Sequence, residues 1–340
     1  MSTLKVIFVI IGAIIGAGFA SGKEIYEYFA KFGAVSLLYC IPLFLLFFML
    51  INIYLKFGSK FTNFNLKVCN NSIVKSINFG KIKINYINIF MFVTFFILCS
   101  AMYSGLFSLF KTYFPNLNSV FLFIGIFILS HFASNGSFKF LSTISIIVVP
   151  LIIAYIFINS GTTFNAQNIT AFNGKNILSL PLLCLLYACQ NTFLSSFILI
   201  KNGQGLTNKQ QNIVATVTAF ILTALIAVGV LCLLSCPDSI NEEMPFAVCA
   251  SNISPLFGAL YGIIIFFAII TTYCTALTSL KEYFKGDKKY NKQIVMVLLI
   301  ALFSLFNFGV IVEYLYPLIG IFGAVYIIIL CKHKNFNFNI

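Results

Sequence analysis

The sequence has few charged residues, no arginine and no tryptophan, and these deficits exclude a soluble globular protein. Charged residues make up 9% of the 340 positions, hydrophobic residues make up 60%, and the mean hydropathy is +1.01. Soluble domains carry roughly 25% charged residues, so the composition indicates a polytopic membrane protein that sits in a lipid bilayer. Without tryptophan, the aromatic belts at the membrane surfaces must consist of tyrosine and phenylalanine.

The sequence also lacks the motifs of intramembrane and metal-dependent enzymes. It contains neither H-E-x-x-H nor G-x-S-x-G, and its histidines are His131 and His333. The ten cysteines lie mostly within apolar runs and form no C-x-x-C pair, which predicts buried apolar side chains. We therefore expect no catalytic residues, no enzyme activity and no bound cofactor.

Ten apolar stretches approach or exceed the roughly 20 residues that cross a bilayer as a helix. They are Leu4–Phe32, Val35–Leu55, Ile87–Phe110, Leu117–Ala133, Phe138–Ile158, Ile177–Ile200, Ile213–Leu234, Pro255–Leu280, Ile294–Val312 and Tyr314–Cys331. With the N-terminus inside the cell, 17 lysines fall in cytoplasmic segments and 4 in external segments. We therefore expect a multi-pass protein of the cell membrane with both termini in the cytoplasm. This placement also explains the net charge of +13 without nucleic acid as a partner.

The external segment 161–176 divides the chain into residues 1–160 and residues 177–340, each with five spans. Two five-span halves joined by an external loop have opposite topologies, which is the arrangement of an inverted repeat. The sequence thus predicts an all-α integral membrane protein with about ten transmembrane helices in a 5+5 inverted repeat.

The first and sixth stretches carry residues that interrupt helices. Four glycines stand in the first stretch, in Gly12-Ala-Ile-Ile-Gly16-Ala-Gly18-Phe-Ala-Ser-Gly22, and each interior glycine costs a helix roughly 1 kcal/mol relative to alanine. The sixth stretch contains Pro181 and a polar Gln190-Asn191-Thr192 triplet. Such segments are typical of the discontinuous helices of secondary transporters. Alternatively, the glycines allow close helix packing and the triplet joins helices through hydrogen bonds.

A helix that restarts after a break presents free backbone amides, and these suit a carboxylate or another anionic group. The candidate substrate-binding residues are Gly16, Ala17, Gly18, Phe19, Ser100, Tyr103, Tyr187, Gln190, Asn191, Phe193 and Thr275. We expect Glu24 and Glu27 to line a solvated external vestibule, with a cation-binding site as the alternative. No acidic residue is expected deep in the first, third, sixth or eighth span to pair with a strongly cationic substrate.

The run from Gly12 to Ile25, G-A-I-I-G-A-G-F-A-S-G-K-E-I, resembles the opening of the YkvI-like family of bacterial membrane proteins. The close match covers this one motif, and the rest of the chain agrees in length, span number and hydropathy. The resemblance implies the amino acid–polyamine–organocation (APC) superfamily and its LeuT-like fold, with the first and sixth helices broken. It implies no particular substrate.

The eighth span offers ligands for a coupling ion. The hydroxyls of Thr271 and Thr272 are hard oxygen ligands that suit sodium, although threonines in apolar helices commonly bond back to an earlier carbonyl. Sodium-coupled members of the superfamily hold the ion between the broken first helix and the eighth helix. The resemblance therefore implies a sodium site at Gly12, Ile15, Ala268, Thr271 and Thr272. The fifth span holds Lys139 at its cytoplasmic end, which disfavours the proton-coupling lysine of some relatives.

Together these features predict a secondary active transporter that couples sodium to the uptake of an amino acid or similar small carboxylate by alternating access. The alternative is a non-transporting membrane receptor or sensor with the same fold. Such a sensor would need a signalling partner, and the basic link 56–86 is the candidate docking surface. An ion channel is disfavoured because the sequence shows no selectivity-filter repeat and no charged ring.

Overall fold

The computed structural model describes residues 3–60, 77–79, 82–84, 86–133, 138–171, 177–282 and 290–332. Within these residues, each of the ten predicted spans is mainly helical. The α-helices are α1 (Thr3–Ile14), α2 (Ala17–Ser21), α3 (Lys23–Tyr28), α4 (Cys40–Gly58), α6 (Tyr86–Tyr113), α7 (Ser119–Ala133), α8 (Phe138–Thr163), α9 (Ala166–Ala171), α10 (Leu180–Leu194), α11 (Ser196–Gly203), α12 (Asn208–Ser235), α13 (Pro245–Ile253), α14 (Pro255–Glu282), α15 (Tyr290–Phe303), α16 (Phe308–Val310) and α17 (Tyr316–Lys332). Short 3-10 turns cover η1 (Ala30–Phe32), η2 (Ala34–Tyr39), η3 (Ile177–Ser179) and η4 (Pro237–Ser239), and η5 (Ile311–Leu315) is a π-helix.

Six helical segments in the described residues are long and apolar enough to cross a membrane. They are Ala34–Gly58, Asn88–Tyr113, Ile177–Leu194, Asn208–Ser235, Pro255–Leu277 and Phe308–Lys332. The predicted link 56–86 contains a short antiparallel hairpin of β1 (Ile77–Phe79) and β2 (Ile82–Ile84), with Ile77 opposite Ile84. The predicted connecting loop 161–176 also has structure, because it includes the end of α8 and the helix α9.

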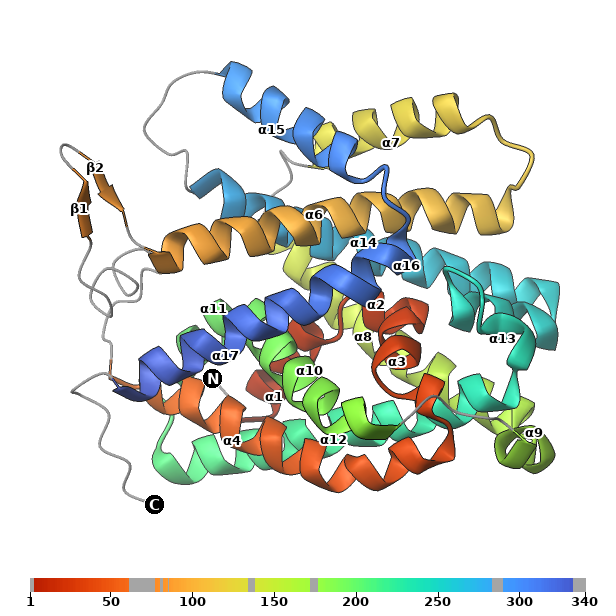
Figure 1. Cartoon of the computed structure of the whole chain (residues 1–340), viewed down its shortest axis with the longest axis horizontal. Helices are drawn as coiled ribbons and strands as arrows, with labels where there is room; N and C mark the ends of the chain where they lie inside the picture. The colour runs from red at the N-terminus through yellow and green to blue at the C-terminus, as the bar shows by residue number, and fades with distance from the viewer. Residues whose placement is uncertain are drawn as a thin grey trace.

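The broken spans lie in the middle of the bundle (Figure 1). α10 packs against α4 and α17, and α1 packs against α8 and α12. α14 packs against α6 and α8, while α7 and α15 lie outside α6 in Figure 1. A helix that is apolar on all sides belongs in such a central position, since every face can be covered by a neighbour.

The first span is divided twice. α1 ends at Ile14, α2 follows a two-residue break, and Gly22 then turns the chain into α3. Gly22 has a left-handed backbone with φ of 84°, which favours glycine, and this explains its place between two short helices. The predicted interruption of the first span is therefore confirmed.

The sixth span is interrupted later than the polar triplet suggests. Asn191 and Thr192 lie inside α10, and the interruption is at Ser195, between α10 and α11. The Asn191 amide donates to the Tyr187 carbonyl at 3.0 Å and the Thr192 hydroxyl to the Ala188 carbonyl at 2.8 Å. These side chains thus satisfy their polar groups along the helix itself, so they do not break it.

The boundary between the last two spans differs from the predicted turn near Glu313. α15 ends at Phe303, and the Ser304 hydroxyl bonds back to the Ala301 carbonyl at 2.7 Å. The last span then runs from Phe308 to Lys332, so Glu313 lies within the helical segment. Pro317 lacks the amide that would donate to Glu313 in an α-helix, and the wider π turn ends at Leu315, two residues before it.

Close packing by glycine occurs in the last span. A Cβ added at Gly320 would lie 2.6 Å from the Leu186 carbonyl oxygen, and one at Gly323 would lie 2.5 Å from that of Cys189. α17 therefore crosses α10 at backbone contact, a use of glycine that the sequence did not predict for this span.

Candidate functional site

The breaks of the first and sixth spans meet. At the first break, the Gly16 amide donates to the Ile14 carbonyl at 2.9 Å, which departs from the regular bond to the residue four positions earlier. The Ala13 carbonyl instead accepts a 2.9 Å hydrogen bond from the hydroxyl of Ser195, the residue that interrupts the sixth span. Backbone groups released by a break need partners inside the protein, and here one break supplies the partner of the other.

The eighth span lies beside the same break. The Cβ position of Gly16 lies 3.8 Å from the Thr272 Oγ1 atom, so α14 brings a hydroxyl directly to the first break. The Thr272 hydroxyl donates to the Ala268 carbonyl at 2.9 Å, and the Thr271 hydroxyl bonds to the carbonyls of Phe267 and Ala268. Both threonines thus make the expected back-bonds. A hydroxyl that donates its proton keeps two lone pairs, which remain available to a cation.

The two predicted sodium ligands of the first span, Gly12 and Ile15, precede the residue that lies beside Thr272. Gly12 lies on α1 against α8, since its Cβ position is 3.4 Å from a methyl carbon of Val149. Ile15 is buried in the break itself. The structure therefore brings Gly16 and Thr272 together, and the ligand role of the whole set stays a prediction.

Glu24 is buried, which differs from the expected solvated vestibule. Its residue exposure is 5%, and its carboxyl group lies over Gly18, where no space remains for a Cβ. The phenol groups of Tyr28, Tyr187 and Tyr316 lie within electrostatic range of Glu24. The Oε2 atom of Glu24 has no hydrogen-bond partner.

The groups around Glu24 come from four helices. Tyr28 on α3 donates a 2.5 Å hydrogen bond to the Gln190 Oε1 atom on α10, while the buried Gln190 Nε2 atom has no partner. The ring of Tyr187 lies 5.0 Å from that of Tyr28, and the buried Tyr316 hydroxyl also has no partner. We call Gly18, Glu24, Tyr28, Tyr187, Gln190 and Tyr316 the Glu24 cluster.

Three of these residues were sequence-predicted substrate ligands, namely Gly18, Tyr187 and Gln190. Sequence reasoning missed Tyr28 and Tyr316. Tyr28 follows Glu24 by four residues, and that spacing on one helix face would have indicated it. Tyr316 has no comparable local signal.

The remaining predicted substrate residues make other contacts. Ala17 and Phe19 are buried in α2. The Ser100 hydroxyl bonds to the Phe96 carbonyl of its own helix, and the Tyr103 hydroxyl bonds to the Phe123 carbonyl on α7 at 2.7 Å. Phe193 packs on the Tyr326 ring of α17, the Asn191 amide bonds within α10, and the Thr275 hydroxyl bonds to the Thr272 carbonyl. Tyr103 and Phe193 therefore face neighbouring helices.

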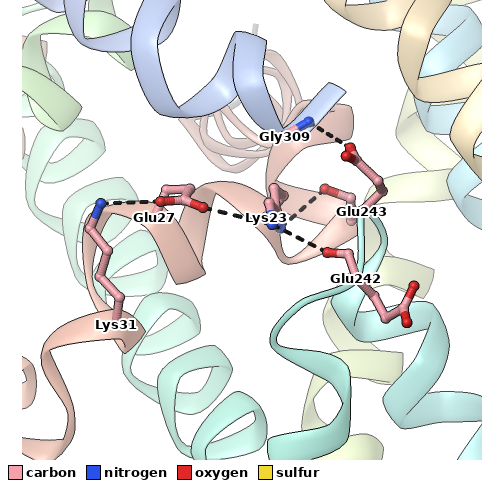
Figure 2. A network of polar contacts seen from close by, with 7 residues as sticks. Lys23, Glu27, Lys31, Glu242, Glu243 and Gly309 are labelled. Carbon is pink, nitrogen blue, oxygen red and sulfur yellow. Dashed lines mark hydrogen bonds and ion pairs between the residues drawn. The ribbon is translucent and has the colours of Figure 1, made fainter. Parts of the chain in front are cut away.

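An ion-pair network involves α3, the helix that also carries Glu24 (Figure 2). The buried Glu27 carboxylate lies 3.7 Å from the Lys23 ammonium and 3.1 Å from that of Lys31. Lys23 also donates to the Glu242 carbonyl at 3.3 Å. The network thus ties α3 to the segment before α13, and Glu27, like Glu24, is buried rather than solvated.

The same segment is held to the last span. The carboxylate of Glu243 accepts a 2.5 Å hydrogen bond from the Gly309 amide in α16 (Figure 2). A Cβ at Gly309 would lie 2.9 Å from Lys23 Cε, so α16 also touches α3. These contacts therefore join three segments that are far apart in the sequence: α3, residues 242–243 and α16.

Comparison with known proteins supports the fold. No family model matches the chain. The uncharacterized membrane protein YkvI of Bacillus subtilis (strain 168) is 25% identical over 350 residues, covering 97% of this chain and 96% of YkvI. The inward-facing conformation of Mhp1 superposes with a TM-score of 0.66 at 9% sequence identity, covering 98% of this chain and 76% of Mhp1. The chain therefore has the all-helical LeuT-like fold that it shares with Mhp1, and it is similar along nearly all its length to the membrane protein YkvI.

Proposed function

We propose that this protein is a secondary active transporter of the APC superfamily that carries a small organic solute by alternating access. The observation that carries the proposal is the meeting of the two interrupted spans, where Ser195 bonds to the Ala13 carbonyl and Thr272 lies beside Gly16. Discontinuous helices that meet between two repeats are the usual location of transporter binding sites. The repeats would comprise residues 1–160 and 177–340, and both termini would lie in the cytoplasm.

Sodium is the proposed coupling ion. The Gly12 and Ile15 carbonyls of the first span, with Ala268, Thr271 and Thr272 of α14, would supply neutral oxygen ligands. The hydroxyl protons already point to helix carbonyls, so their lone pairs can face an ion. An ion that bridges α1 and α14 would favour one arrangement of these helices, and the sodium gradient would thereby drive uptake.

The proposed substrate is an amino acid or a similar small carboxylate, bound between the first break and α10. A thermal-stability assay of the purified protein tests both proposals, because a ligand that binds the folded state stabilises it by mass action. We expect amino acids from a full panel to raise the unfolding midpoint in sodium buffer and much less in potassium buffer.

Thr272→Ala should remove the sodium dependence. The matched control is Thr223→Ala, because Thr223 makes the same back-bond, at 2.8 Å to Ala219, in α12. Equal stabilisation in sodium and potassium would refute sodium coupling. Sodium-dependent binding without uptake into proteoliposomes would favour the receptor or sensor alternative.

A further inference from the structure

Glu24 is a buried acidic residue without a paired cation among the described residues. A charge taken out of water is costly unless it is paired and hydrogen-bonded. The two lysines closest in sequence do not supply the pair, because Lys23 and Lys31 bind Glu27. Among the described residues, no ion pair to Glu24 is formed.

The neighbouring groups are also incompletely bonded. The Tyr28 hydroxyl donates to the Gln190 Oε1 atom, while the Gln190 Nε2 donor and the Tyr316 hydroxyl have no hydrogen-bond partner. All three unpartnered groups belong to residues that are at least nine-tenths buried. The cluster therefore contains one unpartnered acidic acceptor and two unpartnered donors close to the first break.

The unpartnered groups of the Glu24 cluster could bind a ligand that carries both an ammonium group and a carboxylate. An ammonium group would form an ion pair with the Glu24 carboxylate and so offset the cost of its burial. The Gln190 amide and the Tyr316 hydroxyl would then donate to a carboxylate on the same molecule. A zwitterionic α-amino acid presents both groups within a few bonds of each other.

We propose that Glu24 binds the ammonium group of the transported amino acid, with Gln190 and Tyr316 directed to its carboxylate. This proposal rests on the proposed transport function and names the recognition chemistry of its site. It also corrects the expectation that no acidic residue lies deep enough to pair with a cationic group. The position of the carboxyl over Gly18 places this acid beside the break rather than at a solvated mouth.

The test uses matched sets of probes on the purified full chain in sodium buffer. Each set contains an amino acid, the same acid without its amine, and the same amine without its carboxylate: alanine, propionate and ethylamine, and then leucine, 4-methylpentanoate and isoamylamine. Thermal shifts measured at probe concentrations up to about 10 mM give apparent affinities. We expect a member of one amino-acid series to bind at least about tenfold more tightly than its desamino analogue.

Glu24→Gln should lower the affinity for the amine-bearing probe by at least about tenfold. The matched control is Glu242→Gln, because the Glu242 side chain is exposed and its contact with Lys23 uses the backbone carbonyl. If Glu24→Gln does not fold, the comparison of alanine with propionate, or of leucine with its analogue, decides the question on the wild-type protein.

Three results would overturn the ammonium site: a desamino acid that binds as tightly as its amino acid, unchanged affinity in Glu24→Gln, or no stabilisation by any amine. The outcomes also separate this proposal from the transport function. Sodium-driven uptake of a solute without an amine would retain the transporter and reject the site. Binding of an amino acid that depends on Glu24, without accumulation in proteoliposomes, would retain the site and reject the transporter.

Discussion

The Ser195 hydroxyl and the Ala13 carbonyl, 182 residues apart in the sequence, form a 2.9 Å hydrogen bond that joins the two interrupted helices. In a membrane protein this bond has a direct role, since a carbonyl released from a helix needs a new partner within the protein or a watery cavity. It also couples the spans, because a movement of α10 and α11 away from α1 must break it. The bond thus links local helix chemistry to the conformational change that the proposed transport would require.

Ser195→Ala should lower stability by about 1 kcal/mol, because it removes the donor and leaves the Ala13 carbonyl without that partner. Ser59→Ala is the control, since the exposed Ser59 hydroxyl bonds to the carbonyl of Lys56 within one helix turn. Chemical unfolding in detergent compares the two variants. Equal stability of both would contradict the role given to the Ser195 bond.

Gly18→Ala should weaken amino-acid binding by about tenfold, because the new Cβ would occupy the space of the Glu24 carboxyl group and displace it. The loss should be smaller in a Glu24→Ala background, where no carboxyl has to move. A double-mutant cycle on binding affinity measures this coupling. Additive effects would indicate that Gly18 and Glu24 act separately.

The sequence predicts the interruptions better than the site. The glycines of the first span carry their own conformational signal, and Gly22 does take the left-handed backbone that favours glycine. In the sixth span the polar triplet indicates the correct region but not the exact position of the break. The side chains of Asn191 and Thr192 donate to carbonyls of their own helix, and the break is at Ser195.

Burial of Glu24 depends on contacts that a local pattern does not contain. Hydropathy predicts that an acidic side chain faces water, whereas Glu24 is buried, with Tyr187 and Tyr316 of distant helices in its surroundings. The same applies to Tyr103, whose polar position on α6 suggested a substrate ligand. Its hydroxyl bonds to α7 instead, and that choice follows from how the helices pack.

Gly22→Ala should destabilise the protein by about 2–4 kcal/mol, because alanine at φ of 84° is strained and its Cβ would lie 2.8 Å from the Phe246 ring. Gly205→Ala is the matched control. Gly205 has φ of 76°, with no atom within 4 Å of the added Cβ, so the loss should be about 1–2 kcal/mol. Unfolding midpoints give the difference in stability loss between the two variants. This difference measures the cost of the clash with Phe246, because both variants share the backbone strain. Similar losses at both glycines would exclude that clash.

Glu27→Gln should destabilise the protein by about 3 kcal/mol, because two lysines would lose the carboxylate that neutralises them while remaining largely buried. The side chains of Lys23 and Lys31 are 10% and 12% exposed, so water screens them little. Glu242→Gln removes one carboxylate from the same end of the bundle but keeps the backbone carbonyl that Lys23 contacts, and it should change stability by less than about 0.5 kcal/mol. Denaturant unfolding of both variants at the same salt concentration makes the comparison. A loss in Glu242→Gln as large as that in Glu27→Gln would assign the effect to total charge, whereas the expected difference assigns it to the pairs that Glu27 makes with Lys23 and Lys31.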